Sequence, residues 1–243
     1  MRFSGKNVWF SRSGPLIIGH RGASAAAPEN TLAAFRLAQQ HGADGIEFDV
    51  QLSADGIPVV IHDDTVDRTT NGRGRVSDLT LAQLQTLDAG QGETIPTLAQ
   101  VFAEFGTTLL YNLEIKNDDQ LDQGAEKAIA DCIRHDGVQE QLLISSFNPA
   151  ALARMYALLG DAVPLGFLHI GMIDRYSPDW PFPCHADHPY YEAVDADYMT
   201  WAKEQAYLVN IWTLDDASIA QQLISLGVHG LITNTPDWLR QNL

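Results

Sequence analysis

Apolar, strand-like runs alternate with amphipathic helical segments along almost the whole chain. The strand-like runs cover residues 16–19, 45–52, 109–115, 142–146, 163–167, 193–195, 207–212 and 230–233. The helical segment NTLAAFRLAQQHG, for example, starts at an Asn-Thr cap and ends at Gly42. Continuous apolar strands that alternate with helices predict a parallel sheet buried on both faces.

Eight strands of this kind match a closed (β/α)8 barrel, the TIM-barrel fold. A length of 243 residues suits one such barrel, so we expect a single domain over residues 1–243. The alternative is a doubly wound open sheet, but no glycine-rich nucleotide-binding loop follows the first strand. The closed α/β barrel is therefore the prediction.

The alternation breaks after the second strand. The turn SADG follows residues 45–52, and PVVIHD is then predicted to return as a hairpin strand. We expect an insertion at about residues 57–95, on the side where the carboxyl ends of barrel strands carry active sites. A second irregular stretch, residues 169–189, is rich in proline and aromatic residues and is expected to form another wall of the barrel mouth.

Three carboxylates lie on two of the predicted strands. Glu47 and Asp49 in GIEFDV share one strand face, and Glu114 shares a face with Lys116 in NLEIK. Carboxylates that face one cavity repel one another unless a cation lies between them, and a hard divalent cation binds their oxygens readily. The pattern indicates a metal site. The alternatives are solvated carboxylates on a surface strand and, for Glu114, a simple ion pair with Lys116.

Two histidines end apolar runs, His20 in IIGHRG and His62 in PVVIHD. A lone histidine at a strand end is more often structural. A pair of histidines beside a cation, by contrast, supplies a proton donor and a proton acceptor. Metal-assisted hydrolysis is therefore the first hypothesis.

The formal net charge of −16 argues against nucleic acid or an anionic membrane surface as a partner. A small anionic substrate needs local cations, which Arg21, Lys116 and a metal ion would supply. The alternative for both side chains is salt bridging on the outer surface. Phe147 and Trp212 end predicted strands, and we expect them either to line the substrate pocket or to pack in the core.

An ordered set of motifs runs through the chain: HRG, PENT, ExD, HD followed by DRTTNG, LEIK and a strand that contains tryptophan. With these motifs the chain closely resembles the glycerophosphodiester phosphodiesterase family, over residues 16–236. The resemblance implies a phospholipase-C-like barrel. It also implies hydrolysis of glycerophosphodiesters, such as glycerophosphocholine or glycerophosphoethanolamine, to glycerol 3-phosphate and an alcohol.

The resemblance further implies three groups of site residues. By position, the metal ligands are Glu47, Asp49 and Glu114, the acid/base pair is His20 and His62, and the phosphate contacts are Arg21 and Lys116. Family members use magnesium or calcium and sometimes manganese, so we expect one such cation. Which histidine is the acid, and whether water or the glycerol hydroxyl attacks first, stays open.

Two places depart from the family pattern. Residues 171–189 match no motif, and Asn234 stands where an acidic residue is frequent in the family. We expect the first to affect substrate preference and neither to affect the core chemistry. Glu29 and Asn30 in PENT are expected to cap the first helix, with support of a catalytic group as the alternative for Glu29.

Two other functions stay open. The barrel could cleave lipid phosphodiesters directly by docking through an apolar rim of Trp180, Phe182, Tyr190 and Tyr191. A catalytically inactive barrel could serve as a binding module, although a binder would not need both histidines and all three carboxylates. No aromatic cluster suited to choline is evident, so we expect shallow discrimination among leaving alcohols, within about tenfold.

Cysteine content and targeting signals add little. Two cysteines are too few for a disulfide framework. Cys184 has His185 and His188 nearby, but a structural zinc site takes four ligands, so we interpret Cys184 as part of a loop in the barrel mouth. No signal peptide or membrane-length run is evident. We expect a cytoplasmic monomer or homodimer that acts on a small glycerophosphodiester, without nucleic acid or stable membrane association.

Overall fold

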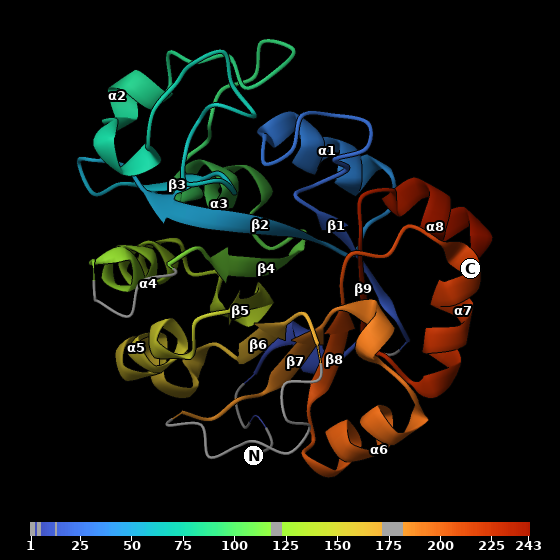
Figure 1. The fold of residues 1–243 in the computed structure, drawn as a ribbon. Helices are drawn as coiled ribbons and strands as arrows, with labels where there is room; N and C mark the ends of the chain where they lie inside the picture. Colours follow the sequence, from blue (N-terminus) through green and yellow to red (C-terminus); the bar gives the residue numbers. More distant parts are fainter. Residues whose placement is uncertain (1–2, 4–5, 13, 118–122, 172–181) are drawn as a thin grey trace.

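The computed structural model describes residues 3, 6–12, 14–117, 123–171 and 182–243. Eight parallel strands close into a barrel that helices surround (Figure 1). The barrel strands are β1 (Leu16–His20), β2 (Gly45–Leu52), β4 (Leu110–Ile115), β5 (Leu142–Ser146), β6 (Leu165–His169), β7 (Ala186–Pro189), β8 (Leu208–Ile211) and β9 (Gly230–Thr233). Because β1 pairs with both β2 and β9, the eight parallel strands form a closed ring. The predicted (β/α)8 fold is confirmed.

The described α-helices lie between the strands along the chain, and the last one follows β9. They are α1 (Leu32–Gln40), α2 (Leu81–Leu84), α3 (Leu98–Phe105), α4 (Ala125–Asp136), α5 (Pro149–Leu159), α6 (Ala196–Glu204), α7 (Ala217–Leu226) and α8 (Pro236–Asn242). Short 3₁₀ helices cover Val8–Phe10, Val76–Asp78, Gln139–Gln141, Gly160–Ala162 and Tyr191–Ala193. Thr31 caps α1 by accepting a hydrogen bond from the Ala34 backbone, as side-chain oxygens at helix starts commonly do. Within the described ranges, no helix combines the length and the apolar character needed to cross a membrane.

The two faces of β2 carry different side chains. Ile46, Phe48 and Val50 are fully buried against the surrounding helices, where the Phe48 ring lies 5.7 Å from that of Phe35. Glu47 and Asp49 alternate with them and therefore face the barrel interior. The period-two alternation thus separates the core from the site.

The seventh strand lies earlier than predicted. Residues 193–195 hold the end of a 3₁₀ helix and Asp195, the cap of α6, whereas β7 covers Ala186–Pro189. The prediction was wrong because the segment ADHP is short and polar, and its Asp187 and His188 are nevertheless buried. A Cβ at Gly166 of β6 would lie 2.7 Å from the His188 Nε2, so glycine makes room for this imidazole inside the barrel.

Cys184 is also placed differently from the prediction. It is buried just before β7, and the next residue, His185, donates a backbone hydrogen bond to Leu165 at the start of β6. This position is at the amino ends of the strands, opposite the barrel mouth. Cys184 is therefore a core residue and not part of a mouth loop.

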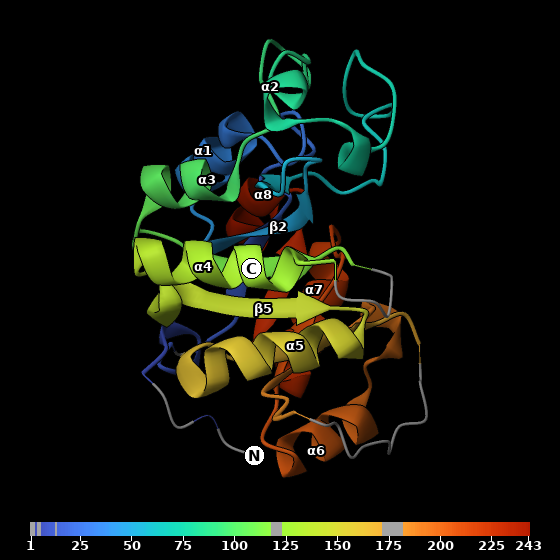
Figure 2. The same ribbon diagram turned by 90° about the vertical axis from the view of Figure 1, so that its left-hand side faces the viewer.

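After β2 the chain returns as β3 (Pro58–Val60), antiparallel to β2. It then passes through a 3₁₀ helix and α2 to α3, and Figures 1 and 2 show this segment on the side of the barrel formed by β2, α1 and α3. The segment has an apolar cluster of its own, formed by Val59, Ile61, Val66, Val76, Leu84, Ala89 and Ile95. This cluster fixes the loop that carries His62.

Candidate active site

Glu47, Asp49 and Glu114 meet at the carboxyl ends of β2 and β4. Each offers one oxygen, these oxygens lie within 4.8 Å of one another, and all three residues are buried. They meet because Asp49 pairs directly with Glu114 across the two parallel strands. Since every donor is a carboxylate oxygen, the set suits a hard cation such as Mg²⁺ or Ca²⁺.

The electrostatics of the cluster favour a cation. Burial, followed by the charges of Asp49 and Glu114, raises the pKa of Glu47 well above its ordinary value. Burial also raises the pKa of Glu114 to about 7, with the Asp49 charge adding to the shift and Lys116 opposing it. Ionising all three carboxylates therefore costs free energy that a divalent ion between them would offset. The residues fit such an ion.

The loop after β1 holds two of these carboxylates in place. The backbone N–H of Arg21 donates to Glu47 Oε2 at 3.1 Å, and Asn30 Nδ2 donates to Asp49 Oδ2 at 2.8 Å. Arg21 and Asn30 have φ values of 55° and 58°, a left-handed conformation that is uncommon for residues other than glycine. Asn30 thus supports the carboxylate cluster, and the prediction that it caps α1 is wrong.

His20 ends β1, and its Nδ1 lies 2.7 Å from Asn234 Oδ1. The Asn234 amide is oriented by Asp215, which accepts a 2.7 Å hydrogen bond from Nδ2, so its oxygen faces His20 and Nδ1 is the donor. The opposite nitrogen, Nε2, lies 4.0 Å from Glu47 Oε2. Burial, followed by the charge of Arg21, lowers the pKa of His20. Asn234, which was expected to leave the core chemistry unaffected, is thus the hydrogen-bond partner of this imidazole.

His62 follows β3, and its Nδ1 lies 2.7 Å from Asp63 Oδ1. Arg68 donates to both Asp63 oxygens, at 2.7 and 2.9 Å, and to both Glu29 oxygens at 2.8 Å. Glu29 also accepts a 2.8 Å hydrogen bond from Arg21. Hydrogen bonds from Arg68 hold the pKa of Asp63 well below its usual range, so Asp63 remains a carboxylate beside His62. Glu29 therefore supports the site, as the alternative reading proposed.

Lys116, Phe147 and Trp212 complete the predicted set. The Lys116 ammonium donates to Glu114 Oε1 at 2.9 Å and lies 3.4 Å from His62 Nε2. It also lies 5.9 Å from the Phe147 ring centroid, a cation–π distance. Phe147 packs edge-on against Trp212, with ring centroids 5.5 Å apart. All three side chains line the same pocket.

This pocket gathers nearly all the predicted residues. It is lined by His20, Arg21, Glu47, His62, Asn112, Glu114, Lys116, Ser145, Phe147, Leu168, His188, Trp212 and Ile232. Sequence reasoning missed Asn112, although the same period-two rule places it on the face of Glu114. Its buried Oδ1 has no hydrogen-bond partner among the residues described. His188 was considered only as a neighbour of Cys184, because its strand was misplaced.

The described residues do not form the aromatic rim that a lipid-cleaving enzyme would need. Phe182 is buried, with 5% of its surface exposed. Tyr190 and Tyr191 are half-buried and pack ring on ring at 4.7 Å. Trp180, the fourth residue of the predicted rim, lies outside the described residues.

Glu47→Gln is expected to stabilise the metal-free protein. Above pH 4.5, the ordinary pKa of a glutamate, the unfolded chain ionises Glu47 freely, whereas ionisation in the folded protein is opposed by burial and by Asp49 and Glu114. The stability advantage of the variant should therefore grow as the pH rises above 4.5. Urea unfolding in chelator at about pH 5 and about pH 8 measures the difference.

The matched control for this prediction is Glu140→Gln, which changes an exposed glutamate at the surface. It should show no such pH-dependent gain. A Glu47→Gln variant that is less stable than the wild type at neutral pH, with chelator present, would contradict charge repulsion in the cluster.

Comparisons with known proteins agree with this geometry. The sequence profile of the "Glycerophosphoryl diester phosphodiesterase family" matches residues 20–238. A "Glycerophosphodiester phosphodiesterase" of Caldanaerobacter subterraneus subsp. tengcongensis is 40% identical over 233 residues, covering 92% of this chain and 96% of the relative.

Solved structures give the same result. An Oleispira antarctica phosphodiesterase, solved in complex with the product sn-glycerol-3-phosphate, aligns with a TM-score of 0.84 and 33% identity. The alignment covers 94% of this chain and 96% of that one. A glycerophosphodiester phosphodiesterase from Agrobacterium tumefaciens aligns with a TM-score of 0.81 and 27% identity, over 93% of this chain and 99% of that one.

Proposed function

The chain belongs to the glycerophosphoryl diester phosphodiesterase family, and on this premise we propose that it hydrolyses glycerophosphodiesters to glycerol 3-phosphate and an alcohol. The observation that carries the proposal is one pocket in which a cluster of three buried carboxylates adjoins two histidines. The sn-glycerol-3-phosphate held by the Oleispira antarctica relative supports the same product.

We assign one divalent cation, magnesium, calcium or manganese, to Glu47, Asp49 and Glu114. When bound, such an ion neutralises charge on the phosphate and makes the phosphorus more electrophilic. Arg21 and Lys116 lie on either side of the carboxylates and would bind the non-bridging phosphate oxygens. Together with a divalent ion, these two cations would outweigh the three carboxylates and make the site locally positive within an acidic protein.

His20 is suited to be the general base. Its lowered pKa keeps the ring neutral at pH 7, and because Nδ1 donates to Asn234, Nε2 carries the lone pair. Nε2 would take the proton of the attacking hydroxyl as its oxygen forms the new bond to phosphorus. The hydrogen bond from Nδ1 to Asn234 then holds the resulting imidazolium in place.

His62 is suited to be the general acid. Its Nδ1 is held by the Asp63 carboxylate at 2.7 Å, which leaves Nε2 facing the pocket beside Lys116. As the bond from phosphorus to the leaving alcohol breaks, Nε2 would donate its proton to the alcohol oxygen. Phe147 and Trp212 would form an apolar wall against the carbon atoms of the glycerol.

A direct test compares three classes of phosphodiester under the same conditions. The proposal expects release of glycerol 3-phosphate from glycerophosphodiesters and far slower turnover of a phosphodiester without glycerol. It also expects that intact diacyl lipid in vesicles is cleaved no faster than the glycerophosphodiesters. Equal turnover of the glycerol-free diester, or preferential cleavage of the intact lipid, would contradict it.

Asn234→Ala is expected to lower kcat by about 10–100-fold, the usual range for removing a residue that orients a catalytic group. Asn234→Asp should retain more activity, because a carboxylate oxygen can accept the same hydrogen bond from His20 Nδ1. Steady-state kinetics measures both variants, with Asn242→Ala near the end of the chain as the matched control. Full activity of Asn234→Ala would show that His20 needs no such partner.

A further inference from the structure

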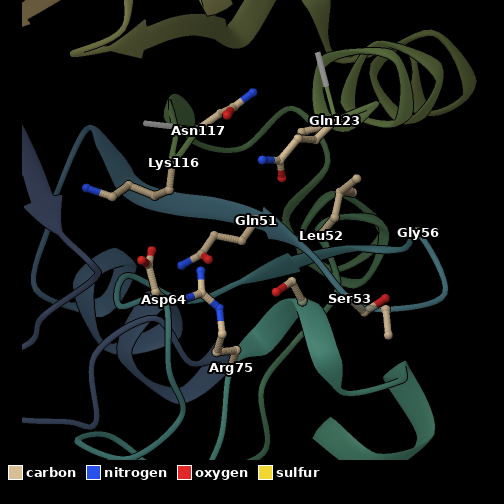
Figure 3. Close-up of a pocket in the computed structure, with 12 residues that line it drawn as sticks. Gln51, Leu52, Ser53, Gly56, Asp64, Arg75, Lys116, Asn117 and Gln123 are labelled. Atoms are coloured by element: carbon tan, nitrogen blue, oxygen red, sulfur yellow. The ribbon is translucent and has the colours of Figure 1, made fainter. Parts of the chain in front are cut away.

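A second, larger pocket lies beside the metal and histidine pocket, with a volume of about 320 Å³. Figure 3 shows its lining, contributed by the end of β2, the segment after β3, the end of β4 and the start of α4. The lining residues are Gln51, Leu52, Ser53, Ala54, Gly56, Asp64, Arg75, Ser77, Lys116, Asn117, Gln123 and Ala125. This volume lies at the lower end of the range of about 300–1,000 Å³ that is usual for ligand pockets.

Lys116 connects the two pockets, because its side chain lines both. A phosphate held at Lys116 therefore has the carboxylates and histidines on one side and the second pocket on the other. His62, the proposed acid for the leaving alcohol, is the histidine next to Lys116, at 3.4 Å. The second pocket is thus where the alcohol arm of a diester would lie.

Some polar groups of this pocket are available to a ligand, although the Gln51 amide nitrogen already donates to three backbone carbonyls. Figure 3 shows Gln51, Asp64, Arg75 and Gln123 directing their polar ends toward the pocket space. Asp64 and Arg75 make no side-chain hydrogen bond or ion pair with the residues described, and neither does the hydroxyl of Ser77. Asp64 and Arg75 are exposed and not paired with each other, and their segments are joined by a backbone hydrogen bond from Val76 to Asp64. They therefore offer both acceptors and donors to a third group.

The lining also excludes one kind of alcohol. It contains no aromatic ring, so it offers no cation–π contact to a trimethylammonium group. Arg75 and Lys116 outnumber Asp64 in this lining, so a cationic head group is disfavoured. A neutral polyol satisfies all these groups, because each hydroxyl can both donate and accept a hydrogen bond.

We propose that this pocket binds the leaving alcohol and selects diesters whose alcohol is a neutral polyol, such as glycerol or a cyclitol, with Asp64 and Arg75 as the selecting residues. This inference rests on the proposed function and departs from the expectation of discrimination within about tenfold drawn from the sequence. Two or three hydrogen bonds of ordinary net strength correspond to a preference of about 10–100-fold in kcat/KM. The preference should fall mainly on KM, because remote hydroxyls bind equally in the ground and transition states.

The test measures kcat/KM for four glycerophosphodiesters, with glycerol, inositol, choline and ethanol as the leaving alcohol. The kcat/KM of the wild type should be about 10–100-fold higher for the two polyol diesters than for the other two. The ethyl diester has neither a charge nor further hydroxyls, so it shows the effect of losing the hydrogen bonds alone. In the Asp64→Asn/Arg75→Gln double variant, the kcat/KM values for the polyol diesters and the ethyl diester should differ by no more than about threefold. The matched control is Arg73→Gln, which removes an arginine two residues away that is 91% exposed and outside the lining, and it should leave the wild-type preference unchanged.

The outcomes distinguish this inference from the function on which it rests. No hydrolysis of any of the four diesters would overturn the proposed function. Hydrolysis of all four with similar kcat/KM would overturn polyol selection alone. A double variant that loses activity equally on all four would show a structural role for Asp64 and Arg75, which also overturns the inference.

Discussion

Replacement of His62 or of His20 by alanine is expected to lower kcat by about 10²–10⁴-fold, the usual loss when a positioned acid or base is removed. Each histidine is held through Nδ1, His20 by Asn234 and His62 by Asp63, so that Nε2 is left for proton transfer. Neither ring is part of an apolar cluster, so both variants should fold. Steady-state kinetics on a glycerophosphodiester measures the loss.

The identity of the leaving alcohol separates the two roles. With an activated alcohol such as a nitrophenol, which leaves without a proton, the loss in His62→Ala should largely disappear, whereas the loss in His20→Ala should persist. His135→Ala, at the exposed end of α4, is the matched control and should retain full activity. The opposite pattern would reverse the assignment, and near-native turnover by either variant would exclude that histidine from catalysis.

Removal of divalent metal is expected to abolish turnover almost completely. Without the cation, Glu47 and Glu114 are held near Asp49 with raised pKa values, and the substrate phosphate would add further negative charge to the same pocket. Dialysis against chelator should lower activity by about 10³-fold or more, and magnesium, calcium or manganese should restore it. Elemental analysis should give one bound ion per chain.

The control for metal removal is the same dialysis with chelator saturated by metal beforehand, which should leave the activity intact. Turnover that persists in protein shown to be metal-free would remove the cation from the mechanism. The carboxylates would then act only as acid, base or structural groups.

The parts of the site that follow from local periodicity were predictable from the sequence. Glu47 and Asp49 alternate with apolar residues on β2, and Asn112, Glu114 and Lys116 share one face of the region around β4. Because the carboxyl ends of parallel strands lie side by side, these side chains are predicted to meet.

The strand β7 was missed because it lacks such a pattern. Its residues are polar and buried inside the barrel, so no hydrophobic pattern indicates a strand there.

The hydrogen bonds that orient the proposed catalytic groups were not predictable in this way. His20 and Asn234 are 214 positions apart and meet only because β1 and β9 close the barrel. Arg68 reaches Glu29 across 39 positions, through a loop whose path depends on the small apolar cluster after β3. Sequence motifs pointed to the proposed acid, base and metal ligands, whereas closure of the barrel determines which residues hold them.

The most direct test of the account is phosphorus NMR of glycerophosphocholine incubated with the metal-loaded protein. Hydrolysis at this site predicts that glycerol 3-phosphate appears as the sole new phosphomonoester, in step with free choline, and that neither forms when chelator is present. Formation of phosphocholine and glycerol instead would show that the bond between phosphorus and the glycerol oxygen is cleaved, and not the bond to choline. Formation of glycerol 3-phosphate by the metal-free protein would contradict the role assigned to Glu47, Asp49 and Glu114.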